Sequence, residues 1–300
     1  MDKNKIQSKR SRGFSERKLT LGLFVVPGFL MYSIFFILPI LLGAYYSLTD
    51  WNGISPKFHF VGLQNYIRII SDSAFKKALS FNFKYTAILM IGTCVIGITL
   101  ALFLNSKIKG RSFFRALYFF PAVLSMLTVS LIFNQIFYRV IPALGSKMGS
   151  TTFSSNILAN KNLAVYGILF VHLWQGVALP TLLFLAGLQT IPEELYEAAA
   201  LDGATGFKKF RYITIRYLMP TLSVVLVLTL KSGLMVFDYI KSMTEGGPGG
   251  ATQSIALLIY NDGFVKNRYS YGIAEAILAG LIIAFISAVQ IKFADGKKVE

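Results

Sequence analysis

The sequence predicts an all-α protein that crosses a membrane several times. Of its 300 residues, 54% are hydrophobic, and the mean hydropathy of +0.58 is higher than one soluble core requires. Long apolar stretches, such as 21–46 and 85–104, contain no charged residue. About 20 helical residues cross the ~30 Å hydrocarbon layer, where a helix satisfies its own backbone groups. We therefore expect six transmembrane helices, over residues 21–46, 85–105, 113–137, 163–189, 217–238 and 273–291.

The first of these helices follows a basic tail over residues 1–18. The seven Lys and Arg residues of the tail also fit the start of a secretory signal peptide. The apolar stretch is about twice as long as the apolar region of a signal peptide, and no small-x-small cleavage site follows it. We expect a retained helix that opens a six-span domain over residues 19–292, followed by a C-terminal tail over 293–300.

The distribution of Lys and Arg between the predicted helices indicates the orientation of the chain. The two terminal segments and the loops 106–115 and 190–216 carry 18 of these residues, whereas the alternate loops carry 11 over a greater length. Cytoplasmic loops of membrane proteins are enriched in Lys and Arg. Both termini and the segment 190–216 are therefore predicted to be cytoplasmic.

The net charge of +16 is better explained by the membrane than by nucleic acid. The basic residues flank apolar stretches, where topology and anionic headgroups account for them, and no basic soluble surface remains to bind nucleic acid. The single cysteine, Cys94, lies inside the second predicted helix. The two histidines, His59 and His172, fall in different compartments, which excludes a histidine-rich metal site. We predict neither a metal site nor catalytic residues.

The chain also lacks the glycine-rich loop with a lysine that binds nucleotide phosphates. Its one Gly-Lys pair, Gly296-Lys297, is followed by Lys and Val near the end of the sequence. We therefore expect a non-enzymatic subunit without a cofactor of its own. If ATP drives transport, another subunit must bind it.

A polar segment over 190–216 interrupts the apolar pattern. Pro192 suits a first helical position, and the two glutamates after it favour the positive end of the helix dipole. Gly203 ends this helix, since glycine readily adopts the left-handed conformation, and a second short amphipathic helix follows from Phe207 to Ile213. Two exposed short helices with apolar side chains are typical of a docking element. A linker that lies on the membrane surface is the alternative.

The polar segment contains Glu197-Ala198-Ala199, with Gly203 six residues after the glutamate and Ile213 ten residues further on. This pattern resembles the EAA loop of permease subunits in binding-protein-dependent ABC importers. The chain departs from the family at Ile215-Arg216, where Leu-Pro is usual.

Two outer segments resemble motifs of the carbohydrate-type permeases. Residues Phe60–Tyr66 are similar to the F-V-G-L-x-N-Y motif, and Thr244–Pro248 begins a segment similar to T-x-G-G-P…T. The resemblance covers residues 20–292.

The family resemblance implies the core of a type I ABC importer permease in a prokaryotic cell (inner) membrane. It implies a second homologous permease, two ATPase subunits that hold ATP and Mg²⁺, and an extracytoplasmic solute-binding protein that delivers a sugar or oligosaccharide. Permeases for glycerol phosphate or glycerophosphodiesters share these motifs and remain an alternative. The residues implied to couple the permease to the ATPase are Glu197, Ala198, Ala199, Asp202, Gly203, Phe207 and Ile213.

Polar residues inside the fourth and fifth predicted helices indicate the substrate path, since such residues are costly in hydrocarbon unless they face a watered cavity or another helix. Helical spacing places them on one face of each helix, and Trp174, Phe237 and Tyr239 offer an aromatic face for a sugar. Packing between helices, which also gathers small and polar residues, is the alternative. The candidate pathway residues are His172, Gln175, Gly176, Thr229, Ser232, Gly233 and Val236.

Three charged residues fall in or near the predicted spans. Lys231 lies at the middle of the fifth span, with Asp238 seven residues on, and Glu275 lies on the outer part of the sixth span. We expect Lys231 to form a structural or gating ion pair with a carboxylate of this chain or of the second permease. An anionic group on the substrate is the alternative.

Two other classes of protein remain open at this stage. A secondary transporter would carry inverted repeats and broken helices at the membrane midplane, and no repeat between the two halves is apparent. A membrane scaffold that does not transport would need no polar face in the fourth and fifth helices.

Overall fold

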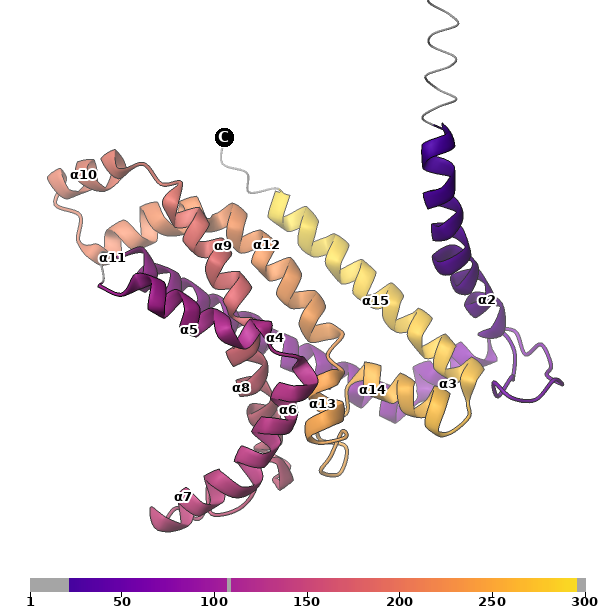
Figure 1. The fold of residues 1–300 in the computed structure, drawn as a ribbon. Coiled ribbons are helices and arrows are strands. Elements are labelled where there is room, and N and C mark those ends of the chain that lie inside the picture. The colour runs from indigo at the N-terminus through magenta and orange to yellow at the C-terminus, as the bar shows by residue number, and fades with distance from the viewer. Residues whose placement is uncertain (1–21, 107–108, 296–300) are drawn as a thin grey trace, which may run out of the picture.

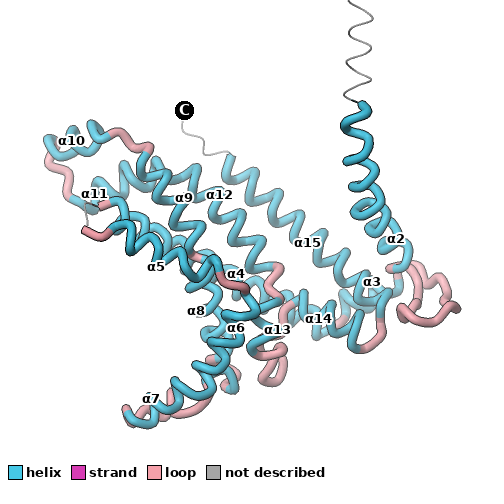
Figure 2. Tube along the Cα trace, viewed as in Figure 1, coloured by secondary structure: helices cyan, strands magenta, loops and turns pink. Residues whose placement is uncertain are grey.

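The computed structural model describes residues 22–106 and 109–295, and over these residues it contains helices and no β-strand (Figure 2). The all-α prediction is confirmed. The first span, Gly22–Tyr46, includes η1 (Ser33–Ile37) and α2 (Leu38–Tyr46). The helices that follow are α3 (Gln64–Ser71), α4 (Ser73–Asn105), α5 (Arg111–Val123), α6 (Met126–Gln135), η2 (Ile136–Val140), α7 (Ile141–Lys147), η3 (Ile157–Ala159), α8 (Ala164–Gly176), α9 (Ala178–Gln189), α10 (Glu193–Leu201), α11 (Gly206–Lys209), η4 (Phe210–Thr214), α12 (Ile215–Leu234), α13 (Asp238–Met243), α14 (Ile255–Tyr260), η5 (Asn261–Val265) and α15 (Tyr269–Asp295).

Within the described residues, five helices are long and apolar enough to cross a membrane, and the bent pair α8–α9 makes a sixth span if it is counted as one. The expected fold of a membrane protein with six helical spans agrees with this. The five continuous helices are Gly22–Tyr46, Ser73–Asn105, Met126–Lys147, Gly206–Leu234 and Tyr269–Lys292.

The region expected to form the third span, 113–137, is divided between α5 and α6. Leu124 and Ser125 have extended backbones, with ψ angles of 148° and 136°. A broken helix in hydrocarbon exposes carbonyl groups that need a partner. The Gln175 side chain from α8 supplies one, since its Nε2 donates to the Leu124 carbonyl at 2.8 Å. The long apolar helix of this region therefore begins at Met126.

The fourth and fifth spans also differ in detail from the expected ranges. α8 and α9 meet at a bend of 48°, three residues before Pro180, which lacks the N–H that would bond to the carbonyl of Gly176. The helix expected over 217–238 begins at Gly206 and ends at Leu234. The second short helix of the polar segment is therefore continuous with the fifth span.

α4 lies at the centre of the bundle and packs against α9 and α12, while α12 also packs against α15 (Figure 1). Small residues allow these contacts. At Gly187 of α9, for example, a Cβ would lie 2.9 Å from a methyl group of Leu218 on α12. Close backbone approach at small residues is the usual way in which membrane helices pack.

The first span lies apart from the rest of the bundle along most of its length (Figure 1). None of its most apolar 18-residue window is buried, and the chain joins the bundle where Gly43 comes close to Ile273 of α15. The described ends at residues 22 and 295 lie toward the side of the molecule that carries α10, whereas α7 and α13 lie toward the other side.

Candidate functional site

A buried hydrogen-bonded group joins α4, α8 and α12. His172 is 6% exposed, and its Nδ1 lies 2.9 Å from the hydroxyl of Tyr85, while its Nε2 lies 2.9 Å from the hydroxyl of Ser232. A neutral imidazole has one donor and one acceptor, which both hydroxyl groups can complement. The predicted proximity of polar residues on the fourth and fifth spans is thus found at His172 and Ser232.

A second chain of hydrogen bonds begins at Tyr239 of α13. The Tyr239 ring stacks on the His172 ring, with the ring centroids 4.6 Å apart, and its hydroxyl donates to Oε1 of Gln175 at 2.8 Å. Gln175 in turn donates to the carbonyl of Leu124. Gln175 therefore satisfies a carbonyl group at the break between α5 and α6. It does not line the two pockets described in the next paragraph.

Two pockets meet at His172 and Ser232. One, of about 180 Å³, is also lined by Gly176 and Thr229, together with Thr93 of α4. The other, of about 330 Å³, is lined by Lys231, Val236, Phe237, Asp238 and Tyr239 in addition to the shared pair. Hydroxyl, imidazole, ammonium and carboxylate groups beside aromatic rings are the chemistry that binds a sugar.

Gly233 lies on the packed side of α12, away from these pockets. A Cβ at Gly233 would be 2.6 Å from Oγ1 of Thr86 on α4. Next to it, Asn82 donates to the carbonyl of Leu234 at 2.7 Å and accepts a hydrogen bond from the backbone N–H of Ile255 at 2.9 Å. Gly233 therefore allows α4 and α12 to approach, which is the packing alternative for this residue.

The ion pair expected of Lys231 does not form with a carboxylate of the described chain. Lys231 and Asp238 are exposed and line the same pocket, but Lys231 forms no ion pair within residues 22–106 and 109–295. The fifth span ends at Leu234, so Asp238 begins a separate helix instead of lying two turns further along the same one.

Glu275 is fully buried, and neither of its carboxylate oxygens has a hydrogen-bond partner in the described part of the chain. Nearby on η5, Asp262 is also buried and is paired with Lys266 and Arg268 at 3.2 and 3.1 Å. Glu275 is therefore not a partner of Lys231 in this structure.

The polar segment has the two short helices that the sequence predicts. α10 ends at Leu201, and Gly203 in the turn after it has a φ of +73°, the left-handed conformation. The N–H of Ala204 donates to the carbonyl of Ala199 at 2.8 Å. A hydrogen bond of 2.9 Å between the hydroxyls of Tyr196 and Thr214 ties α10 to the start of the fifth span.

The candidate coupling residues fall into two groups by exposure. Glu197, Ala198, Asp202, Gly203 and Phe207 are exposed, with Phe207 76% exposed. Ala199 and Ile213 are half-buried, and Ile213 packs with Leu195 against the apolar cluster of α9 and α12. Within this chain Ile213 therefore anchors the segment, while the first group is available to a partner.

Sequence reasoning missed the residues that α4 contributes. Asn82, Tyr85 and Thr93 all lie on α4, where Asn82 is a polar residue at helical spacing from Tyr85 and Thr86. That spacing was the one signal in the sequence for a polar face on the second span. Trp174, offered as an aromatic face for a sugar, lines a separate apolar groove, whereas Phe237 and Tyr239 line the pathway pocket.

No group of three or more His, Cys, Asp or Glu residues that could hold a metal ion occurs in the described ranges. The candidate site consists of the buried hydrogen-bonded group at His172 with its two pockets, and of the exposed helix α10, which is joined to it through α12.

The family and the similar proteins that match this chain are all described as components of transport systems. Residues 93–296 match the family described as binding-protein-dependent transport system inner membrane component. The multiple sugar-binding transport system permease protein MsmF of Streptococcus mutans is 46% identical over 277 residues, which cover 92% of this chain and 95% of that protein. The trehalose/maltose transport system permease protein MalF of Thermococcus litoralis is 34% identical over 284 residues, which cover 92% of this chain and 94% of that protein.

The fold is also that of a solved transporter. A chain in the crystal structure of a bacterial ABC transporter involved in the import of the acidic polysaccharide alginate matches with a TM-score of 0.82 and 20% sequence identity, covering 97% of this chain and 100% of that chain. At this identity the likeness shows the fold alone, and the family follows from the sequence matches. The chain belongs to the family of binding-protein-dependent transport system inner membrane components, the permease subunits of ABC importers.

Proposed function

We propose that this permease forms, with a second homologous permease, the path by which a sugar or oligosaccharide enters a prokaryotic cell. The observation that carries the proposal is the pair of pockets that meet at His172 and Ser232. Ser232 lies on the helix Gly206–Leu234, whose first residues belong to the polar segment 190–216, which we call the coupling segment. Two relatives with high coverage are named for multiple sugars and for trehalose and maltose.

The exposed face of α10 is proposed to contact one of two ATPase subunits, which hold the ATP and Mg²⁺. The residues assigned to this contact are Glu197, Ala198, Asp202, Gly203 and Phe207, with Ala199 and Ile213 holding the segment in place. The hydrogen bond between Tyr196 and Thr214 ties α10 to the continuous helix from Gly206 to Leu234, so a displacement of α10 is transmitted along that helix to Ser232. The chain itself acts as a non-enzymatic transport subunit.

The proposed orientation places α10 and both termini in the cytoplasm. The excess of Lys and Arg in these segments supports it. The opposite face, with α7 and the loop between α13 and α14, then faces the extracytoplasmic solute-binding protein. A related transporter has been solved in complex with an alginate pentasaccharide-bound periplasmic protein, and it shares this fold.

The charges of the larger pocket favour a neutral sugar over glycerol phosphate. Lys231 contributes one positive charge and Asp238 one negative charge, so the pocket has no excess of basic groups. Phosphate-binding sites typically gather several donors or an arginine around the anion. Phe237 and Tyr239 also offer the apolar rings that pack on sugar faces.

Uptake by the reconstituted transporter tests the proposal. A tagged chain should co-purify with a second permease and an ATPase, and the assembled complex with its binding protein should take up a neutral oligosaccharide when ATP is supplied. Ser232→Trp should block the pathway and reduce uptake at least tenfold while assembly stays intact. Val224→Trp, on an exposed face of the same helix, is the matched control and should transport normally.

Two results would overturn the proposal. One is a chain that brings down neither an ATPase nor a second permease. The other is normal uptake by Ser232→Trp, which would place the pathway elsewhere. Preferential uptake of glycerol phosphate would replace the sugar with the alternative substrate class.

A further inference from the structure

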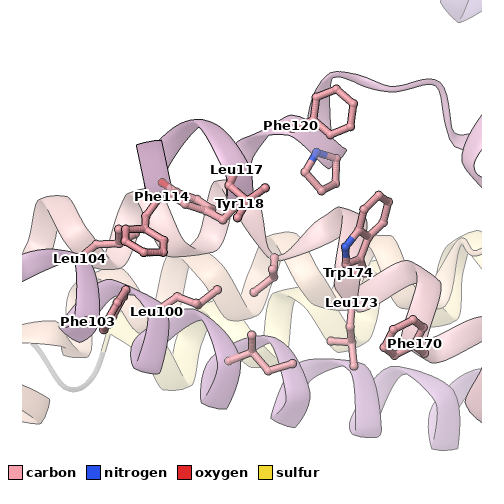
Figure 3. Close-up of a pocket in the computed structure, with 13 residues that line it drawn as sticks. Leu100, Phe103, Leu104, Phe114, Leu117, Tyr118, Phe120, Phe170, Leu173 and Trp174 are labelled. Carbon is pink, nitrogen blue, oxygen red and sulfur yellow. The ribbon is translucent and has the colours of Figure 1, made fainter. Parts of the chain in front are cut away.

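An apolar groove of about 600 Å³ lies between α4, α5 and α8, separate from the pathway pockets (Figure 3). Phe103 and Leu104 from α4 lie on one side, Phe114 and Tyr118 from α5 on the other, and Trp174 closes one end. None of its lining residues is charged. Because α4 and α8 belong to apolar spans and α5 directly precedes the third span, the groove is suited to a hydrocarbon chain.

Two arginines lie beside the end of the groove where α5 begins. Arg111, Phe114, Arg115 and Tyr118 are spaced i, i+3, i+4 and i+7 on α5, so they share one face of that helix. Phe114 and Tyr118 line the groove, which places the two arginines next to its mouth.

The arginine at the helix start lacks a partner in this chain. Nε and Nη2 of Arg111 are shielded from water and form no hydrogen bond within the described residues. Neither Arg111 nor Arg115 forms an ion pair among those residues. A guanidinium group presents a planar set of donors that matches phosphate oxygens, so an anionic group at the mouth of the groove would satisfy it.

We propose that the groove binds an acyl chain of an anionic phospholipid, with the phosphate held by Arg111 and Arg115. Basic pockets between membrane helices on the cytoplasmic side are suited to acidic headgroups. The assignment to the cytoplasmic leaflet rests on the orientation given under the proposed function. A transmembrane helix of a second permease is a poorer occupant: a first span like Gly22–Tyr46 carries no acidic residue to pair with the arginines.

Quenching of Trp174 fluorescence by brominated lipid measures occupancy of the groove. The assembled transporter with Trp51→Phe in this chain is placed in nanodiscs, so that Trp174 is the one tryptophan of the chain. A transporter with both Trp51→Phe and Trp174→Phe gives the background fluorescence of the other subunits. Phosphatidylglycerol with brominated acyl chains should quench Trp174 at a lower mole fraction than phosphatidylcholine with the same chains.

The arginines are tested by a charge-matched pair of variants. Each basic residue near an anionic surface changes affinity about fivefold, so Arg111→Gln with Arg115→Gln should raise the half-quenching mole fraction of phosphatidylglycerol about 25-fold. Lys76→Gln with Lys77→Gln removes the same charge from exposed positions at the opposite end of α4, and it should leave the quenching curve unchanged.

Three outcomes would overturn the lipid assignment. These are equal quenching by the two lipids, an unchanged curve for the arginine variant, and complete protection of Trp174 in the assembled complex, which would identify a protein occupant. A second measurement separates the lipid proposal from the proposed function. The same purified transporter is reconstituted into proteoliposomes, and its uptake of oligosaccharide is measured there. Normal uptake without lipid preference refutes the lipid site alone, whereas lipid preference without uptake refutes the proposed function alone.

Discussion

At the level of single residues, Gly233 lies on the face of α12 that was predicted to line the pathway, but it packs against α4 instead. A Cβ there would lie 2.6 Å from Oγ1 and 2.9 Å from Cβ of Thr86. We expect Gly233→Ala to lower the free energy of unfolding by about 1–3 kcal/mol, the usual cost of overpacking. Thermal unfolding of the purified transporter measures this. Gly280→Ala is the control, since a Cβ there meets nothing within 4 Å, and an equal loss in both variants would contradict the packing role.

The contact between His172 and Tyr85 makes a second prediction. Tyr85 is fully buried, and His172 is the one hydrogen-bond partner of its hydroxyl within the described chain. His172→Phe should therefore destabilise the protein by about 1–3 kcal/mol, the cost of a buried hydroxyl without a partner. Tyr85→Phe in the same chain removes that hydroxyl and should recover much of the loss. Additive losses in the double variant, measured by thermal unfolding, would show that the two groups are not coupled.

Asp50 and His59 give a prediction of pH dependence in the loop that follows the first span. The backbone N–H of His59 donates to the Asp50 carboxylate at 2.6 Å, and this bond lowers the pKa of Asp50 below its usual value of 3.8. Because the pKa is lowered in the folded loop, the stabilisation is present above the usual value and is lost as the pH falls through the lowered one. The protection factor of the His59 amide, which compares its exchange rate with that of a free peptide at the same pH, should be high at neutral pH and should fall only below the usual Asp pKa of 3.8. Asp50→Asn should exchange faster at neutral pH, and equal protection in both forms would rule out the bond.

The contacts of His172 with Ser232 and Tyr85 show which parts of the candidate site could be predicted from the sequence and which could not. Helical spacing correctly placed His172 and Ser232 among the polar residues of two neighbouring spans. Tyr85 was missed because its bond to His172 joins residues 87 positions apart on helices whose rotation about their axes is set by packing. The spacing of Asn82, Tyr85 and Thr86 indicates a polar face on α4, but it does not tell which helix that face meets.

At the level of elements, the coupling segment depends on the turn after α10. Gly203 has a φ of +73°, which side chains with a Cβ rarely adopt. Gly203→Val should tilt α10 and reduce sugar uptake severalfold more than it reduces the ATPase activity of the complex. Gly203→Asn should keep both, since asparagine tolerates the left-handed conformation.

The matched control for this turn is Gly206→Ala at the start of α11. A Cβ at Gly206 meets nothing within 4 Å, and its φ lies outside the left-handed range. If Gly206→Ala and Gly203→Val impaired uptake equally, flexibility of the segment would matter more than the conformation of Gly203.

The third span shows why element boundaries are harder to predict than the elements themselves. Residues 113–137 are apolar with few interruptions, so they predict one helix. The break at Leu124 and Ser125 contains neither Gly nor Pro, and it is compensated by Gln175, which lies 51 residues from Leu124 in the chain. A long-range hydrogen bond of this kind leaves no local sequence pattern. The bend in the fourth span, in contrast, has a local cause in Pro180, although the sequence predicts one helix over 163–189.

At the level of the whole molecule, the first span is a helix without a surface to pack on in this chain. Gly22–Tyr46 is apolar on all sides and exposed along nearly its whole length. A helix that is hydrophobic all round is stable when lipid or another protein surrounds it. This property agrees with a permease that assembles with a second membrane subunit.

The orientation of the whole molecule makes the last prediction. Cys94 is the single cysteine, so Cys94→Ser gives a background in which one introduced cysteine reports its own side of the membrane. Ser154→Cys, in the loop after α7, should react with a membrane-impermeant maleimide while the inner membrane is intact. Lys109→Cys, in the basic loop before α5, should react only after permeabilisation, because the excess of Lys and Arg holds such loops in the cytoplasm. Both positions are exposed, so the reverse labelling pattern would place α10 outside, where no cytoplasmic ATPase can reach it.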